Sequence, residues 1–205
     1  MTFDDDDVDL ASKTTVFQGF YRVDRYDVRY RRFDGDWSPE IRREVFERGH
    51  VVAVVLYDPA IERLVMIEQF RPGALAAGWH PWLVEIVAGG VEDGESAADV
   101  ARREALEEAD CRVLDLVPMC RFLAIPAACS ETTEMFCGLV DASGVGGLHG
   151  LDSEGEDIRA TAVPVEQAMD WLDSGAIVNA RTIIGLQWFR THRAAYRERW
   201  RDRDR

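Results

Sequence analysis

The sequence predicts an α/β sandwich, with residues 1–48 attached to it as an N-terminal antiparallel β element. Two observations lead to this fold class. Short runs rich in β-branched and aromatic residues, separated by turn-forming residues, dominate the first half of the chain and return at 158–164. Segments whose apolar residues recur at helical spacing are interleaved late, at 165–174 and 180–199. A sheet that buries its apolar faces against helices accounts for both patterns.

The first strands are expected between Phe17 and Arg48. The run FQGFYRVDRYDVRYRRF is followed by the turn DGDW and then by EIRREVFERG. Asp34-Gly35 is a strong hairpin signal, because glycine adopts the positive φ that tight hairpins need. The acidic run Asp4–Asp7 is expected to be a solvated, disordered lead-in.

The next strands begin at residue 51. Segments 51–58 and 63–71 flank PAIE, which predicts a second hairpin. Residues 82–88 are expected to form one buried strand that runs directly into Gly89-Gly90. The remaining expected strands lie near 112–124, 132–141 and 158–164.

An acidic helix is expected over 97–109, with Ser96 as its N-cap. On a helical wheel, one narrow stripe of small side chains lets this helix lie close against a sheet. The stripe consists of Ala98, Ala101, Ala105 and Ala109. Three carboxylates fall beside it, namely Glu104, Glu107 and Glu108. Arg103 offsets part of their repulsion by pairing with Glu107 at i,i+4.

These carboxylates have two interpretations. Most charge runs on helices are solvated faces. Alternatively, carboxylates that converge beside a strand ending in Gly-Gly form a site for a hard cation such as Mg²⁺, with a substrate phosphate completing its shell. A bound cation also permits an anionic substrate in spite of the net charge of −14.

Composition excludes several classes of protein. A chain with a net charge of −14 and a single lysine is unsuited to non-specific binding of nucleic acid or anionic membranes. We find neither an apolar run of about 18 residues nor a secretory signal, and expect a cytoplasmic protein. The four cysteines form no CxxC pair, so buried free thiols are expected at Cys111, Cys120, Cys129 and Cys137.

The stretch GGVEDGESAADVARREALEEAD resembles the Nudix box, G-x5-E-x7-R-E-U-x-E-E-x-G-U, in which U is an apolar residue. The match runs from Gly89 through Glu95 to the helix that contains Arg103. Two positions depart from the pattern. Ala105 is smaller than the usual aliphatic residue, and Asp110 replaces a glycine that ends the helix in the left-handed conformation. Since Asp adopts that conformation more readily than most residues, we expect only a small loss of stability.

Further segments are similar to the bacterial ADP-ribose pyrophosphatase branch of the Nudix hydrolases. They are IRREVFERGH (41–50), VMIEQFR (65–71), Pro126 after the box, GLHGLDSEGEDI (147–158) and NARTIIGLQW (179–188). The resemblance implies a Nudix domain over 49–205, with a mixed sheet between helices, and a β domain over 1–48 that is exchanged within a homodimer. It also implies hydrolysis of ADP-ribose to AMP and ribose 5-phosphate with Mg²⁺ or Mn²⁺.

Carried over position by position, the resemblance implies a role for individual residues. The metal ligands are the Ala88 carbonyl, Glu104 and Glu108, with Glu156 close to the metal. The catalytic residues are Glu154 as general base, Glu107 as a further ligand or neighbour, and Arg103, which orients the carboxylates. The substrate contacts are Phe20 stacked on adenine, Arg43 and Arg71 on the diphosphate or ribose, and Glu131. Gly89 and Glu95 support the loop and helix.

Two alternative functions stay open. Ala127 and Ala128 stand where the family commonly has glycines, which keeps another nucleoside diphosphate derivative, such as a nucleotide sugar or a dinucleoside polyphosphate, as a possible substrate. An alternative of another class is a non-catalytic ADP-ribose-binding sensor. Because Glu104, Glu107 and Glu108 are all present, the sequence favours the enzyme.

Overall fold

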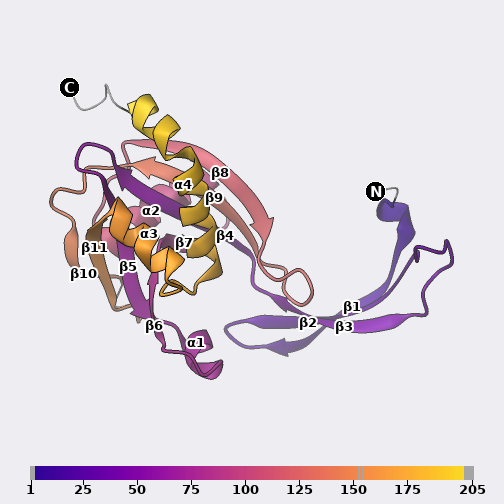
Figure 1. Ribbon diagram of the computed structural model, residues 1–205. Coiled ribbons are helices and arrows are strands. Elements are labelled where there is room, and N and C mark those ends of the chain that lie inside the picture. Colours follow the sequence, from indigo (N-terminus) through magenta and orange to yellow (C-terminus); the bar gives the residue numbers. More distant parts are fainter. Residues whose placement is uncertain (1–2, 152, 154, 201–205) are drawn as a thin grey trace. The chain divides into compact units, whose positions relative to one another are not determined.

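The computed structural model describes residues 3–151, 153 and 155–200 (Figure 1). The chain forms two compact units. The first consists of Met1–His50 with Phe122–Thr133, and the second of Val51–Arg121 with Glu134–Arg205. The division at residue 48 stays a prediction, and the structure adds that residues 122–133 belong with the N-terminal strands.

The first unit contains a three-stranded antiparallel sheet. Its strands, in the order β1-β2-β3, are Val8–Gln18, Arg22–Tyr30 and Ile41–Glu47. The predicted hairpin is confirmed, because β2 pairs with β3 and Gly35 lies between them with a φ of 90°. The segment 122–133 joins this sheet through Phe46, which donates to the Ala128 carbonyl and accepts from the Ser130 amide.

The acidic lead-in is ordered, so the prediction of disorder for Asp4–Asp7 is wrong. Asp5–Asp7 form a short 3-10 helix, η1. The Asp4 side chain accepts from the Asp6 amide at 3.0 Å, and the Asp4 amide donates to the Asp7 carboxylate at 3.0 Å. The charges therefore act as reciprocal caps for helix-end amides, a use that a count of like charges does not reveal.

The second unit is built on a mixed eight-stranded sheet. The strands along its main path, β10-β11-β5-β4-β9-β8, are Gly146–His149, Ile158–Pro164, Arg63–Phe70, His50–Asp58, Thr132–Leu139 and Asp115–Leu123. Two short strands extend it: β6 (Trp82–Glu85) pairs with β5, and β7 (Val87–Gly90) pairs with β4. The single strand predicted over 82–88 is therefore two. The chain changes partner at Ile86, whose amide donates to the Thr182 hydroxyl instead.

Helices cover both faces of this sheet, which confirms the predicted α/β/α sandwich (Figure 1). On one face, Val54 and Ala105 share an apolar core beneath α2 (Ala97–Ala109). On the other face lie α3 (Val165–Asp173) and α4 (Ala180–Trp200). There Tyr57 of β4 meets Phe189 of α4 with ring centroids 4.8 Å apart. A short helix, α1 (Pro72–Ala76), and strand β10 were not predicted.

The ends of α2 follow the sequence prediction. The Ser96 hydroxyl accepts from the Asp99 amide at 3.2 Å and so caps the first turn. Asp110 ends the helix with φ 47° and ψ 40°, which is the left-handed conformation. The Nudix box pattern has glycine at this position. The stripe of small residues is buried at Ala101, Ala105 and Ala109, which lets the helix approach the sheet closely.

Two findings bear on the predicted environment of the protein. Across residues 3–151, 153 and 155–200, no helix combines the length and the apolar character needed to cross a membrane. All four cysteines are free. Cys111 and Cys137 are buried as predicted, and Cys120 and Cys129 are half-buried.

Candidate active site

The predicted metal ligands meet where β7 runs beneath α2. A Cβ atom built on Gly89 would lie 1.7 Å from a carboxylate oxygen of Glu104. Because a real Cβ atom never approaches another atom so closely, the Glu104 carboxylate occupies the space that the missing side chain leaves. Gly89 therefore allows Glu104 to lie directly on the strand.

Glu108 lies one helical turn further along and is 2% exposed. Its carboxylate accepts from the Ala88 amide at 3.0 Å, which ties the helix to β7. The structure thus places the Ala88 backbone beside Glu108 through its N–H. The predicted role of the Ala88 carbonyl as a ligand stays a prediction.

Both carboxyl groups are held in an environment that disfavours their charge. Burial, together with the charges of Glu104 and Glu156, raises the pKa of Glu108 to about 8, against the opposing effects of the Ala88 hydrogen bond and the Arg71 charge. Burial likewise raises the pKa of Glu104 to about 7, opposed by Arg103. Paired, desolvated carboxylates of this kind are stabilised by a cation, and hard oxygen donors are those that Mg²⁺ and Mn²⁺ prefer.

Arg103 connects the acidic residues of the box. It donates to both oxygens of Glu95 at 2.9 and 3.0 Å, to Glu104 at 2.7 Å and to the Gly90 carbonyl at 3.1 Å. The predicted i,i+4 pair with Glu107 is confirmed at 3.0 Å. The Arg103 hydrogen bonds lower the pKa of Glu95. Arg103 therefore fixes the glycine loop and helix as one unit.

The acidic loop approaches the same cluster. Glu156 accepts from the Leu151 amide at 3.3 Å, and the Gly150 amide donates to the Glu107 carbonyl at 3.2 Å. The predicted base, Glu154, lies outside the described residues. Within the described part of the chain, no three His, Cys, Asp or Glu side chains already surround one point as a metal site. A cation here must also take oxygen atoms from backbone, water or substrate, as Mg²⁺ usually does.

The predicted substrate contacts fall in different units. Arg71 lies in the second unit, pairs with Glu85 and lowers the pKa of Glu108 by its charge. The others lie in the first unit. There Phe20 is 94% exposed, and Arg43 is exposed and donates to the Arg42 carbonyl at 2.8 Å. Glu131 is buried, with Arg48 at 3.8 Å.

Phe20 lies at the edge of a pocket of about 440 Å³ in the first unit. It is lined by Gln18, Phe20, Arg22, Glu47, Arg48, Gly49, His50 and Ser130. An exposed aromatic ring beside two guanidinium groups can stack on a nucleobase and contact an anionic group. Arg22 and Arg48 line this pocket, although the sequence prediction had chosen Arg43.

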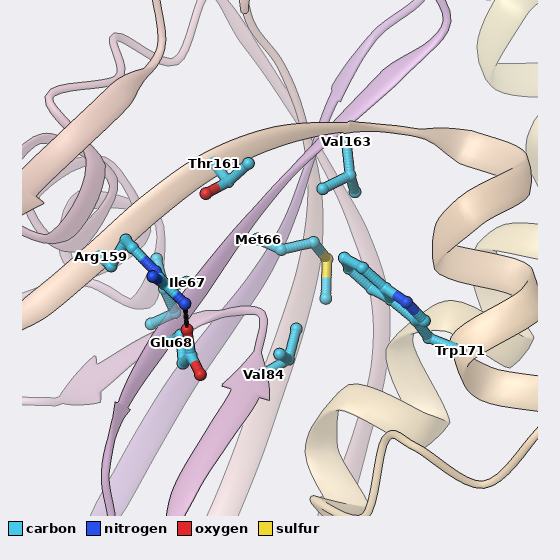
Figure 2. Close-up of a pocket in the computed structure, with 8 residues that line it drawn as sticks. All are labelled: Met66, Ile67, Glu68, Val84, Arg159, Thr161, Val163 and Trp171. Atoms are coloured by element: carbon cyan, nitrogen blue, oxygen red, sulfur yellow. Dashed lines mark hydrogen bonds and ion pairs between the residues drawn. The ribbon is translucent and has the colours of Figure 1, made fainter.

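Another pocket, of about 230 Å³, lies under α3 in the second unit (Figure 2). Figure 2 shows Trp171 of α3 facing Met66, with an ion pair between Arg159 and Glu68 nearby. These side chains belong to the face of the sheet opposite α2, away from the carboxylates. Since ligand pockets usually measure about 300–1,000 Å³, we do not assign this one to the substrate.

Sequence reasoning missed three polar residues of the second unit. Glu85 is an acid within the apolar run WLVEIVA, and its burial at 2% exposure makes it unusual. Asn179 donates to Glu85 at 2.6 Å. The side-chain nitrogen of Gln69 is buried without a hydrogen-bond partner among the described residues. For Glu85, the available signal was a charged residue inside an apolar strand. Asn179 gave no such signal, because its partner Glu85 lies far away in the sequence.

Comparisons with known proteins agree with this geometry. The NUDIX domain family model matches residues 47–186. The ADP-ribose pyrophosphatase of Escherichia coli K12 is 44% identical over 98% of this chain and 96% of its own length. The ADP-ribose pyrophosphatase of Haemophilus influenzae is 35% identical over 97% and 93%. A GDP-mannose pyrophosphatase of Cronobacter sakazakii is 30% identical over 88% and 93%. A crystal structure of an ADP compounds hydrolase superposes with a TM-score of 0.70 at 19% identity, over 93% of this chain and 96% of that one.

Proposed function

Because this chain belongs to the NUDIX domain family, we propose that it hydrolyses the diphosphate bond of ADP-ribose, giving AMP and ribose 5-phosphate. The observation that carries the proposal is the pair of desolvated carboxylates, Glu104 and Glu108, held on β7 by Gly89 and the Ala88 amide. Nearly full-length similarity to relatives named ADP-ribose pyrophosphatase supports the choice of substrate.

The proposed cofactor is a divalent cation, Mg²⁺ or Mn²⁺. The Glu104 and Glu108 carboxylates fit such a cation, since they are hard donors whose burial disfavours their charge. The Ala88 carbonyl and Glu156 are proposed to complete the protein's share of the ligands. When bound, the metal neutralises the diphosphate and makes water a better nucleophile.

Glu154 is proposed as the general base and Glu107 as an additional ligand or neighbour. Glu154 precedes Glu156 by two residues, and the charge of Glu156 acts on both Glu104 and Glu108. A base on this loop can take the proton of a water that attacks phosphorus beside the carboxylates. Arg71 is proposed to contact the diphosphate or ribose.

Phe20 is proposed to stack on adenine, Arg43 to contact the diphosphate or ribose, and Glu131 to be a further substrate contact. We further propose a homodimer that exchanges residues 1–48. Its support is the apolar surface of the first unit's sheet, where Val8, Leu10, Val16 and Phe17 are all exposed. A cytoplasmic location agrees with the free cysteines, since disulfides are rare in that reducing compartment.

A second candidate substrate is GDP-mannose, because relatives named GDP-mannose pyrophosphatase are also similar to this chain. Ala127 and Ala128 bear on this choice. Neither has a positive φ, so their backbone does not require glycine. Both alanines are exposed, so each methyl group changes the surface of this loop where the family commonly has glycine.

The test is release of the nucleoside monophosphate by purified protein, each time with Mg²⁺ and with Mn²⁺. The product is AMP from ADP-ribose or a diadenosine polyphosphate, and GMP from GDP-mannose. We expect a clear preference for ADP-ribose and no activity after chelation. Turnover of GDP-mannose alone would replace the proposed substrate. Binding of ADP-ribose without turnover of any substrate would indicate a sensor.

A further inference from the structure

Glu85 ends β6 and is almost completely buried, with 2% of its surface exposed. A carboxylate in such a place has to be paired. Arg71 donates to one oxygen of Glu85 through Nε at 2.8 Å, and its Nη2 lies 2.7 Å from the same oxygen as an ion pair. Asn179 donates to the other oxygen from Nδ2 at 2.6 Å. Both oxygens of Glu85 are therefore held in fixed directions.

Asn179 has a second role at the start of α4. Its side-chain oxygen accepts from the Thr182 amide at 3.1 Å and from the Thr182 hydroxyl at 3.3 Å. The oxygen thus faces the helix and the nitrogen faces Glu85. The Thr182 hydroxyl in turn accepts from the Ile86 amide at 3.1 Å. The first turn of α4 therefore holds the Glu85 side chain and the following backbone at the point where β6 gives way to β7.

Arg71 is the exposed end of this chain of hydrogen bonds. Its Nε and Nη2 are directed to Glu85, and its side chain is 33% exposed. In the described part of the chain, its Nη1 makes no hydrogen bond. Glu85, to which Arg71 is bonded, precedes by three residues Ala88, whose amide donates to Glu108, so the guanidinium lies along the same stretch of chain as the carboxylate site. Its positive charge accordingly lowers the pKa of Glu108. The side of the guanidinium that carries Nε and Nη2 is thus held by Glu85. The side that carries Nη1 is available to an anionic group beside the carboxylates.

We propose that Asn179 and Glu85 are positioning residues that aim Arg71 at the phosphate groups of the substrate. The proposal rests on the proposed diphosphate hydrolysis. An arginine fixed in advance loses less conformational entropy on binding than one that must be ordered by the substrate. The alternative is that the three residues form an ordinary buried ion pair, which serves only stability.

The experiment is a double-mutant cycle on ADP-ribose hydrolysis between Arg71→Ala and Asn179→Ser. Serine is a good N-cap, so Asn179→Ser keeps an acceptor for the Thr182 amide but is too short to reach Glu85. The control is Arg193→Gln, which removes the contacts of α4 with Glu62 and Glu166 far along the helix from Asn179. Each variant is assayed for kcat, KM, melting temperature and the Kd of a non-hydrolysable methylene analogue of ADP-ribose.

We expect Asn179→Ser to raise KM and the analogue's Kd about 10-fold with kcat within about twofold of wild type, as lost ground-state binding does. Arg71→Ala should lower kcat/KM about 100-fold. Adding Asn179→Ser to Arg71→Ala should change kcat/KM by less than about twofold more, because Asn179 acts on the substrate only through Arg71. Arg193→Gln should lower the melting temperature and leave KM unchanged. Glu85→Gln should resemble Asn179→Ser.

Two results overturn the proposal while leaving the proposed function intact. One is additivity, in which Asn179→Ser weakens the Arg71→Ala variant as much as it weakens the wild type. The other is an unchanged KM and Kd in Asn179→Ser with a melting temperature lowered as in Arg193→Gln. If the wild type neither hydrolyses ADP-ribose nor binds its analogue, the proposed function fails and this inference fails with it.

Discussion

Replacing Gly89 by alanine tests whether the approach of Glu104 to β7 creates the active site. The new Cβ would lie 1.7 Å from Oε1 of Glu104, 1.9 Å from Cδ and 2.6 Å from Cγ. All three atoms belong to a flexible side chain, so Glu104 turns away and the backbone stays. We therefore expect loss of the cation site without loss of the fold.

The magnitudes separate these two effects. Burial keeps the pKa of Glu104 near 7, so its movement into water relieves an unfavourable charge. The same movement breaks the 2.7 Å hydrogen bond from Arg103 to Glu104, and this loss lowers the free energy of unfolding. The free energy of unfolding should then change by only about 1 kcal/mol. Loss of one buried carboxylate from the site should lower kcat/KM at least about 100-fold, or about 2.7 kcal/mol of transition-state stabilisation.

The assay compares Gly89→Ala with Gly90→Ala in thermal unfolding and in metal-dependent AMP release. Gly90 is the matched control, because a Cβ built there meets no atom within 4 Å. Gly90→Ala should keep most of the wild-type activity. Wild-type turnover in Gly89→Ala, or equal inactivity of the two variants, would refute the reasoning.

Four further outcomes are expected. Glu108→Gln should lower kcat by orders of magnitude with the circular dichroism spectrum unchanged; near-normal turnover would remove Glu108 from the metal site. Asp110→Gly should raise the free energy of unfolding in denaturant titrations by about 0.5 kcal/mol, since glycine adopts φ 47° without strain. The hydrogen bond from Tyr26 lowers the pKa of Glu47 to about 2. The contribution of ionised Glu47 to the free energy of unfolding is therefore complete above pH 4.5 and is lost as the pH falls toward 2. Thermal unfolding of Glu47→Gln should accordingly depend less on pH over this range. Removal of divalent metal by a chelator should weaken binding of ADP-ribose in calorimetry, and unchanged affinity would contradict the proposed cation.

Local signals in the sequence predicted α2 and its surroundings well. Its apolar spacing, the Ser96 cap and the end at Asp110 all depend on residues within one or two helical turns. The strand over 82–88 was predicted as one element because its break depends on a distant partner. The Ile86 amide bonds to Thr182, 96 residues later, and nothing near Ile86 in the sequence announces this contact.

The same distinction divides the candidate site. Glu104, Glu108 and Arg103 lie on one helix, so a single motif reveals them together. The Glu85–Asn179 contact joins residues 94 positions apart and becomes visible only when α4 is packed against the sheet. Even for Glu104, the motif does not explain why Gly89 is required. The explanation is that the Glu104 carboxylate occupies the space that a Cβ on residue 89 would fill, only 1.7 Å away. This depends on how α2 lies across β7.

The distribution of charge in the site favours a particular order of binding. Arg103 and Arg71 already donate to carboxylates. Besides Glu104 and Glu108, the acidic side chains near them are more numerous, namely Glu85, Glu95, Glu107 and Glu156. An anionic diphosphate that approaches this surface alone meets repulsion, because like charges raise each other's free energy. A cation on Glu104 and Glu108 reverses the sign locally. The acidic site can therefore hold an acidic substrate if metal is bound first or arrives together with the diphosphate.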